Sequence, residues 1–108
     1  MKIDELKNAI QMGMTVEFSA HCQKRMLERN ITREDIIHCI DSGEIIENYP
    51  LNDECSDNSL PSCLILGYRI TDDKAIHIVV GFNNIRLLII SACYPDIEKW
   101  SSDYRKRR

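Results

Sequence analysis

The stretch AIHIVVGFNNIRLLIISACY, residues 75–94, reads as two strands joined by a tight turn. Both halves are rich in Ile, Val and Leu, which favour strands, and Asn83–Asn84 suits a two-residue hairpin turn. With a turn of this length, His77 is expected opposite Ile90. The stretch therefore predicts an antiparallel hairpin at the centre of the fold, and the other elements are placed relative to it.

Two further strands are predicted upstream of the hairpin. EIIENY, residues 44–49, is β-like and is closed by Pro50, and SCLILGYRI, residues 62–70, is a second apolar run. Residues 51–61 are polar and show no apolar rhythm, so we expect an exposed loop there. TDDK, at residues 71–74, is a turn. The four strands can follow one another as an antiparallel meander.

Three helices are predicted before the strands. Apolar residues at helical spacing indicate a first helix over about residues 2–12, and Ser19 can cap a second over residues 20–29. A third is expected to begin after Thr32 and to end at Gly43. We therefore predict a single α+β domain over residues 1–108, in which three N-terminal helices pack on a four-stranded antiparallel sheet, followed by a short C-terminal helix or tail.

Composition narrows the class of protein. Apolar residues make up 44% of the chain and charged residues 29%, as in ordinary soluble domains. The longest apolar run, residues 87–90, is too short to span a bilayer, and the first ten residues do not resemble a secretory signal. We expect a cytoplasmic protein that has no membrane partner; its oligomeric state is left open.

Cysteine content and charge exclude other classes. The five cysteines are an odd number and include no C-x-x-C pair, so we expect free thiols and neither a metal nor another cofactor. The formal net charge of −3 argues against a protein that coats long duplex DNA. Basic residues nevertheless gather in the second predicted helix, and such a local basic site fits a small phosphate-containing target.

Polar side chains form a row on the predicted helix 20–29. At about 100° per residue, His21, Arg25 and Glu28 fall within about 60° of one another, and Arg29 lies at the edge of that arc. The row is either a solvated face held by ion pairs or a site for an anion. His77 poses a similar choice, because its strand is otherwise apolar: it is a hydrogen-bonded core residue or a functional group in a cleft.

Several segments, in order, resemble one bacterial family. They are SAHCQKRMLERNITREDI, GEIIENYP, LPSCLILGY, IHIVV and IISACYPDIEKWSSDYRKR. The set, with H-x-x-x-R-M-x-E-R at residues 21–29, resembles the domain-of-unknown-function family 4258. This resemblance implies a RelE- or barnase-like ribonuclease toxin, in some cases encoded beside a small antitoxin.

The resemblance also suggests which residues form the site. The polar positions of the family fall on His21, Arg25, Glu28, Arg29, His77 and the last strand. The family tends to carry Thr-x-Tyr before its Pro, whereas this chain has Tyr94 directly before Pro95. Loss of the earlier Tyr weakens any role for an aromatic hydroxyl, although Tyr94 remains a candidate for substrate binding.

The leading hypothesis is a metal-independent endoribonuclease toxin that cleaves RNA by attack of the 2′-hydroxyl. His21 and His77 would transfer protons, while Arg25, oriented by Glu28, and Arg29 would bind the phosphate. Its partners would be an RNA substrate and a small antitoxin protein. The alternative is a non-catalytic binding module whose basic helix face docks an acidic protein partner or nucleic acid. In either case, the basic residues 105–108 are phosphate contacts or a solvated end.

Overall fold

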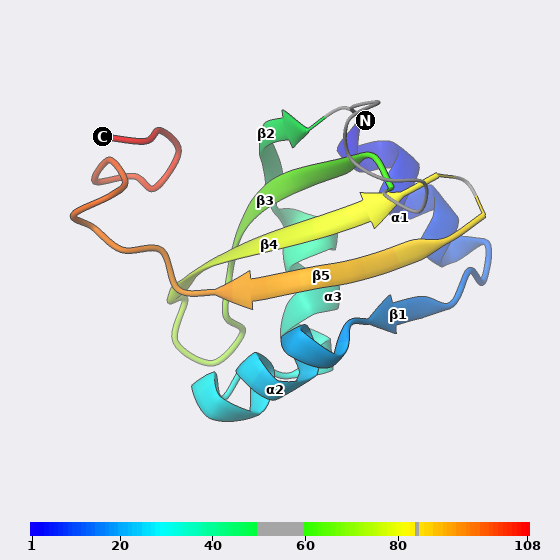
Figure 1. Cartoon of the computed structure of the whole chain (residues 1–108), viewed down its shortest axis with the longest axis horizontal. Helices are drawn as coiled ribbons and strands as arrows, with labels where there is room; N and C mark the ends of the chain where they lie inside the picture. Colours follow the sequence, from blue (N-terminus) through cyan, green and yellow to red (C-terminus); the bar gives the residue numbers. More distant parts are fainter. Residues whose placement is uncertain (50–59, 84) are drawn as a thin grey trace.

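The computed structural model describes residues 1–49, 60–83 and 85–108 (Figure 1). Most of the predicted loop over residues 51–61 lies outside these ranges, and so does the turn residue Asn84. The elements are α1 (Ile3–Gln11), β1 (Val16–Phe18), α2 (Ala20–Arg29), α3 (Arg33–Ser42), β2 (Glu44–Tyr49), β3 (Ser62–Tyr68), β4 (Ala75–Phe82) and β5 (Leu87–Cys93).

The chain is an α+β protein with three helices, but the predicted sheet is wrong. The sheet has five strands in the order β1-β5-β4-β3-β2, and β1 runs parallel to β5, with Val16 opposite Leu87. β1 also lies between α1 and α2, so the helices do not form one uninterrupted N-terminal group. A strand of three residues carries almost no alternation signal, and its partner lies far along the sequence; the prediction missed it for both reasons.

The register of the central hairpin also differs from the prediction. His77 pairs with Cys93, not with Ile90. Two positions of this shift arise because Phe82 pairs with Leu87 across a longer connection, and the third comes from a β-bulge in β5. The shift brings the end of β5, and Tyr94 after it, towards the start of β4.

Side-chain caps fix the ends of α2 and α3 where the sequence predicted them. The Ser19 hydroxyl accepts a hydrogen bond from the Cys22 amide, and Asn30 ends α2 in the left-handed conformation, with φ 60°. At the start of α3, Thr32 and Asp35 form the reciprocal capping box. Residues 30–32 therefore make a short, rigid connection between the two helices.

The helices cover one face of the sheet, which carries the hydrophobic core. Ile76, Ile78 and Val80 of β4 point into this core and are fully buried. α3 lies behind the strands in Figure 1 and approaches β3 closely: a Cβ added at Gly67 would lie 2.5 Å from the Cys39 Cβ. We call this helix-covered side the inner face.

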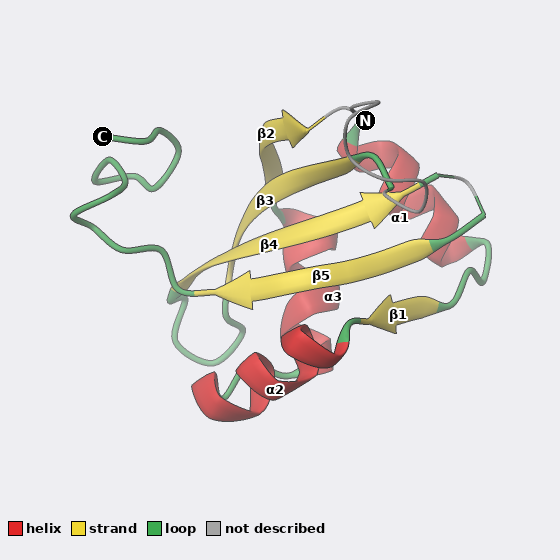
Figure 2. Ribbon diagram, viewed as in Figure 1, coloured by secondary structure: helices red, strands yellow, loops and turns green. Residues whose placement is uncertain are grey.

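Alternation along the strands places other residues on the opposite, outer face. Register aligns Glu44, Leu66, His77 and Cys93 in one row across β2, β3, β4 and β5. Residues 96–108 form turns and one isolated bridge between Trp100 and Arg107, and they contain no helix (Figure 2). The C-terminal end, predicted as a short helix or a tail, is therefore a tail. No helix among the described residues has the length and apolar character needed to cross a membrane.

Candidate functional site

Three of the predicted site residues lie on the exposed surface of α2. His21 and Glu28 are exposed and Arg25 is partly exposed. Arg25 Nη1 lies 2.9 Å from Glu28 Oε2, and both side chains are about two-fifths exposed. Such a pair contributes only tenths of a kcal/mol, at most about 1. It is the ion pair that the solvated-face interpretation predicts.

His77 has a different environment. It is 2% exposed, and the edge of its ring packs against Trp100, with ring centroids 4.4 Å apart. Its Nε2 donates a hydrogen bond to the Tyr104 carbonyl, at 3.0 Å. Burial lowers the pKa of His77 below its ordinary value, although Tyr104 and Glu47 oppose that shift. This histidine is a satisfied, buried residue of the outer face, whereas α2 packs on the inner face through Cys22.

The other two predicted residues, Arg29 and Tyr94, do come together. The Tyr94 hydroxyl donates a 2.6 Å hydrogen bond to the Arg29 carbonyl at the end of α2. Arg29 Nη1 donates to the Ala92 carbonyl, 3.1 Å away on β5. β1 does not extend this far along β5, so Arg29 satisfies a carbonyl on a free strand edge. These bonds attach the C-terminal end of α2 to the end of β5.

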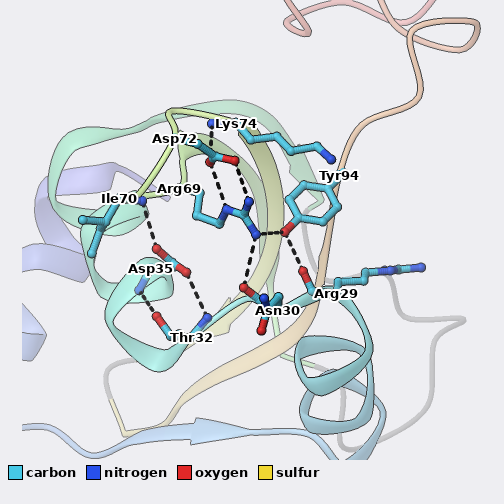
Figure 3. A network of polar contacts seen from close by, with 9 residues as sticks. All are labelled: Arg29, Asn30, Thr32, Asp35, Arg69, Ile70, Asp72, Lys74 and Tyr94. Atoms are coloured by element: carbon cyan, nitrogen blue, oxygen red, sulfur yellow. Dashed lines mark hydrogen bonds and ion pairs between the residues drawn. The ribbon is translucent and has the colours of Figure 1, made fainter.

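Arg69, from the end of β3, completes the contact with Tyr94 (Figure 3). Its Nη1 donates a 2.8 Å hydrogen bond to the Tyr94 hydroxyl, and its Nε and Nη2 donate to the two Asp72 oxygens at 2.9 and 2.5 Å. The Arg69 hydrogen bonds hold the pKa of Asp72 at about 2, so this carboxylate is ionised at neutral pH. Asp72 thus neutralises Arg69 locally and fixes its direction.

Lys74 follows in the same turn between β3 and β4. Its Nζ lies 4.2 Å from the centre of the Tyr94 ring, within range of a cation–π contact. Figure 3 shows the Lys74 side chain beside the Tyr94 ring, whereas the Arg29 side chain extends from the end of α2 away from that ring. We call Arg29, Arg69, Lys74 and Tyr94 the Tyr94 cluster.

Asp35 fixes the turn that carries Arg69 and Lys74. This side chain belongs to a residue only 3% exposed, and its oxygens accept hydrogen bonds from the Thr32 and Ile70 amides at 3.0 and 2.9 Å. Burial raises the pKa of Asp35, but the hydrogen bonds and the Arg69 charge lower it by more, so the pKa lies below its ordinary value. Asp35 therefore holds the β3–β4 turn against the start of α3.

Two cations of the Tyr94 cluster keep their charge available. Within residues 1–49, 60–83 and 85–108, neither Arg29 nor Lys74 forms an ion pair with a carboxylate, whereas Arg69 is paired with Asp72. Arg29 is half-buried and Lys74 is exposed. Lys74 therefore offers a cation against the half-buried Tyr94 ring, and Arg29 offers a second one from the end of α2.

The four described cysteines are buried or half-buried free thiols. Burial raises the pKa of Cys22 and of Cys63 to about 11 and that of Cys39 to about 12, so these free thiols are protonated and inert at neutral pH. In the part of the chain that the structure describes, no group of three or more His, Cys, Asp or Glu residues could hold a metal ion.

Arg69, Lys74 and Asp35 are not among the predicted site residues; the sequence identifies Asp35 only as part of the cap of the third helix. The sequence pattern puts Arg69 inside a predicted strand and Lys74 in a turn, and charged residues are common at such positions. The available signal was the spacing Arg69-x-x-Asp72-x-Lys74 at a strand–turn boundary, which suits a side chain that reaches back to bond its own turn. Contact with Tyr94 depends on the bulged register of β5, which that local pattern does not contain.

Comparison with known proteins gives one match. The model of a family described as a domain of unknown function (DUF4258) matches residues 18–94. No curated protein and no solved structure matches the chain. The matched region begins at the end of β1 and closes with Tyr94.

Proposed function

The chain belongs to the domain-of-unknown-function family 4258, and because that family carries no assigned activity we propose a function from the site itself. We propose that the protein is a binding module for single-stranded RNA and that the Tyr94 cluster contacts the RNA phosphates. The observation that carries this proposal is the Lys74 cation against the Tyr94 ring, with a second cation that has no described carboxylate partner, Arg29, on the residue whose carbonyl the Tyr94 hydroxyl bonds.

The combination of cations and an aromatic ring favours RNA as the ligand. Arg and Lys side chains bind phosphate oxygens, and sites for single-stranded nucleic acids combine such cations with aromatic side chains. The cluster is small and lies on a chain of net charge −3, which fits a short contact of a few nucleotides. An acidic protein patch could also meet the two cations, but it would make no use of the Tyr94 ring beside Lys74.

The environment of His77 favours binding over cleavage. A general base must reach the proton that it removes, directly or through one water molecule. His77 is buried beneath Trp100, and its Nε2 is already bonded to the Tyr104 carbonyl. His21 is exposed on the other side of β5, on the helix that covers the inner face. A proton-transfer pair of His21 and His77 is therefore not part of the proposal.

Salt-dependent RNA binding tests the proposal. Fluorescence anisotropy of a labelled twelve-nucleotide RNA with the full chain is expected to show an affinity that falls with salt, with a slope of about −1.4 for two phosphate contacts. Lys74→Ala and Arg29→Gln should each make the slope shallower by about 0.7. The glutamine retains a donor for the Ala92 carbonyl. Lys2→Ala removes an equivalent exposed charge elsewhere and should leave the slope unchanged.

Four results would oppose this assignment. Absence of salt-dependent binding would remove RNA as the ligand, and an equal loss in Lys2→Ala would show that the Tyr94 cluster has no special role. Binding of polyglutamate in place of RNA would favour the acidic protein partner. Cleavage of the labelled RNA on a gel that is lost in both His21→Ala and His77→Ala would restore the nuclease hypothesis.

A further inference from the structure

The C-terminal segment, residues 96–108, lies against the outer face of the sheet. Arg105 Nε donates a hydrogen bond to Glu44 at 2.5 Å, and Arg107 donates through Nε and Nη2 to the two Glu47 oxygens at 3.0 and 3.1 Å. These contacts join residues about sixty positions apart. The basic end of the chain, which sequence analysis left as either a phosphate contact or a solvated end, is therefore seated on two carboxylates of β2.

Trp100 is the apolar contact of the segment. It is 7% exposed and contacts two side chains. The His77 ring packs against it, and the Arg107 guanidinium lies 4.6 Å from a ring centre of Trp100. Leu66, which neighbours His77 in the outer-face row, is 1% exposed. The outer face thus offers an aromatic-binding position next to two carboxylates.

The C-terminal segment keeps its own shape. The Ser101 amide donates to the Lys106 carbonyl at 2.7 Å, and the Arg108 amide donates to the Lys99 carbonyl at 2.9 Å. The segment follows Tyr94 and Pro95. Tyr94 itself is hydrogen-bonded to Arg29 and Arg69. The segment is thus a compact, internally bonded piece that meets the sheet through the side chains of Trp100, Arg105 and Arg107 and through the Tyr104 carbonyl, which accepts a hydrogen bond from His77.

We propose that the outer face is a peptide-binding site for a basic, aromatic-bearing segment of a partner protein, and that the C-terminal segment is its resident competitor. This surface is distinct from the Tyr94 cluster, and the inference does not rest on RNA binding. The chain's own segment displays the chemistry that the face accepts: arginines for Glu44 and Glu47, and an aromatic ring for His77.

The two ion pairs of the segment are exposed, so they can exchange, whereas the buried Trp100 ring has to be replaced by another aromatic ring. The Arg105–Glu44 side chains are 47% and 48% exposed, and Arg107 is 62% exposed against 24% for Glu47. Ion pairs this exposed are weak and screened by salt, so a partner with the same groups can replace them. Tyr49, whose hydroxyl bonds Glu47, keeps that carboxylate oriented whichever segment is bound.

The peptide DIEKWSSDYRKRR, residues 96–108 with a fluorescent label, serves as the probe. In the wild-type protein the tethered segment competes at an effective concentration in the millimolar range, so the peptide should bind weakly. Arg105→Ala/Arg107→Ala in the full chain removes both ion pairs of the resident segment. The labelled peptide should then bind about 2- to 30-fold more tightly, the range expected for two exposed pairs.

Matched variants make the result decisive. Lys106→Ala changes a cation of the same segment that forms no ion pair with a described residue, and it should leave peptide affinity unchanged. A peptide carrying Trp100→Ala should bind the double variant more weakly than the native peptide does. Acrylamide quenching of Trp100, the single tryptophan of the chain, should increase in the double variant and confirm that the segment has opened.

Three outcomes would overturn the proposal. The first is equal peptide affinity for the wild-type protein and the double variant, and the second is equal binding of the native and Trp100→Ala peptides. The third is a dimer of the double variant in analytical ultracentrifugation, which would assign the site to the segment of a second copy. Lys74→Ala should not affect any of these readouts, so failure here is distinguishable from failure of RNA binding.

Discussion

Removal of the Tyr94 hydroxyl is expected to weaken the junction between α2, the β3–β4 turn and β5. Tyr94→Phe deletes a hydrogen bond to the Arg29 carbonyl and another from the charged Arg69 guanidinium. A neutral hydrogen bond contributes about 0.5–1.5 kcal/mol and one to a charged group about 1.5–3 kcal/mol. Arg69 retains Asp72, so we expect a total loss of about 2–3 kcal/mol in the free energy of unfolding.

Urea and thermal unfolding followed by circular dichroism measure this loss. For a domain of this size, about 2–3 kcal/mol corresponds to a fall in Tm of about 8–12 °C. Tyr68→Phe is the matched control, because Tyr68 is 38% exposed and its hydroxyl forms no hydrogen bond with a described residue. The reasoning fails if Tyr94→Phe unfolds within about 0.5 kcal/mol of Tyr68→Phe.

Three further predictions concern buried positions. Asp35→Ala should lower the free energy of unfolding by about 3 kcal/mol, because the Thr32 and Ile70 amides lose their acceptor. Folding lowers the pKa of Asp35, so the wild-type protein should lose this stabilisation as pH falls below about 4, whereas the variant should not. Equal urea midpoints of the two proteins at pH 7 would contradict this prediction. Gly67→Ala should destabilise by about 1–3 kcal/mol, because its new Cβ would meet Cys39 at 2.5 Å; an unchanged Tm would show that α3 yields freely. Burial lowers the pKa of His77, with Glu47 opposing this shift and Arg107 assisting it, so the His77 contribution to the free energy of unfolding should be complete above about pH 6.5 and decline below that pH. His77→Gln should make this decline in the urea midpoint shallower. An unaltered pH profile would show that His77 is not its cause.

The helices could be predicted because their signals are local. Ser19, Thr32 and Asp35 cap helices through side chains that act within three residues, so the caps are visible in the sequence. The four longer strands were also visible as β-branched and apolar runs. β1 was not, since Val16–Phe18 is held by pairing with β5 and not by its own composition.

The candidate site depended on non-local geometry and was therefore only partly predictable. Arg29 and Tyr94 were proposed from residue type and resemblance, and the structure brings them together. His77 was proposed from the same kind of evidence, but its exposure is decided by Trp100, which lies in a segment that sequence analysis took for a short helix or tail. A lone tryptophan in an otherwise polar tail was the available sign that the tail packs on the sheet.

The distribution of partners among the basic residues reconciles a net charge of −3 with a basic site. Arg105 and Arg107 are committed to the carboxylates of β2, Arg86 to Glu17 and Arg69 to Asp72. Displacement of the C-terminal segment would leave Glu44 and Glu47 bare, which would make the outer face more acidic and less suited to RNA. Arg29 and Lys74 of the Tyr94 cluster form no ion pair with these carboxylates, so their charge is available for phosphate whether the segment is seated or released. The two proposed ligands therefore carry opposite charge and address opposite sides of the sheet.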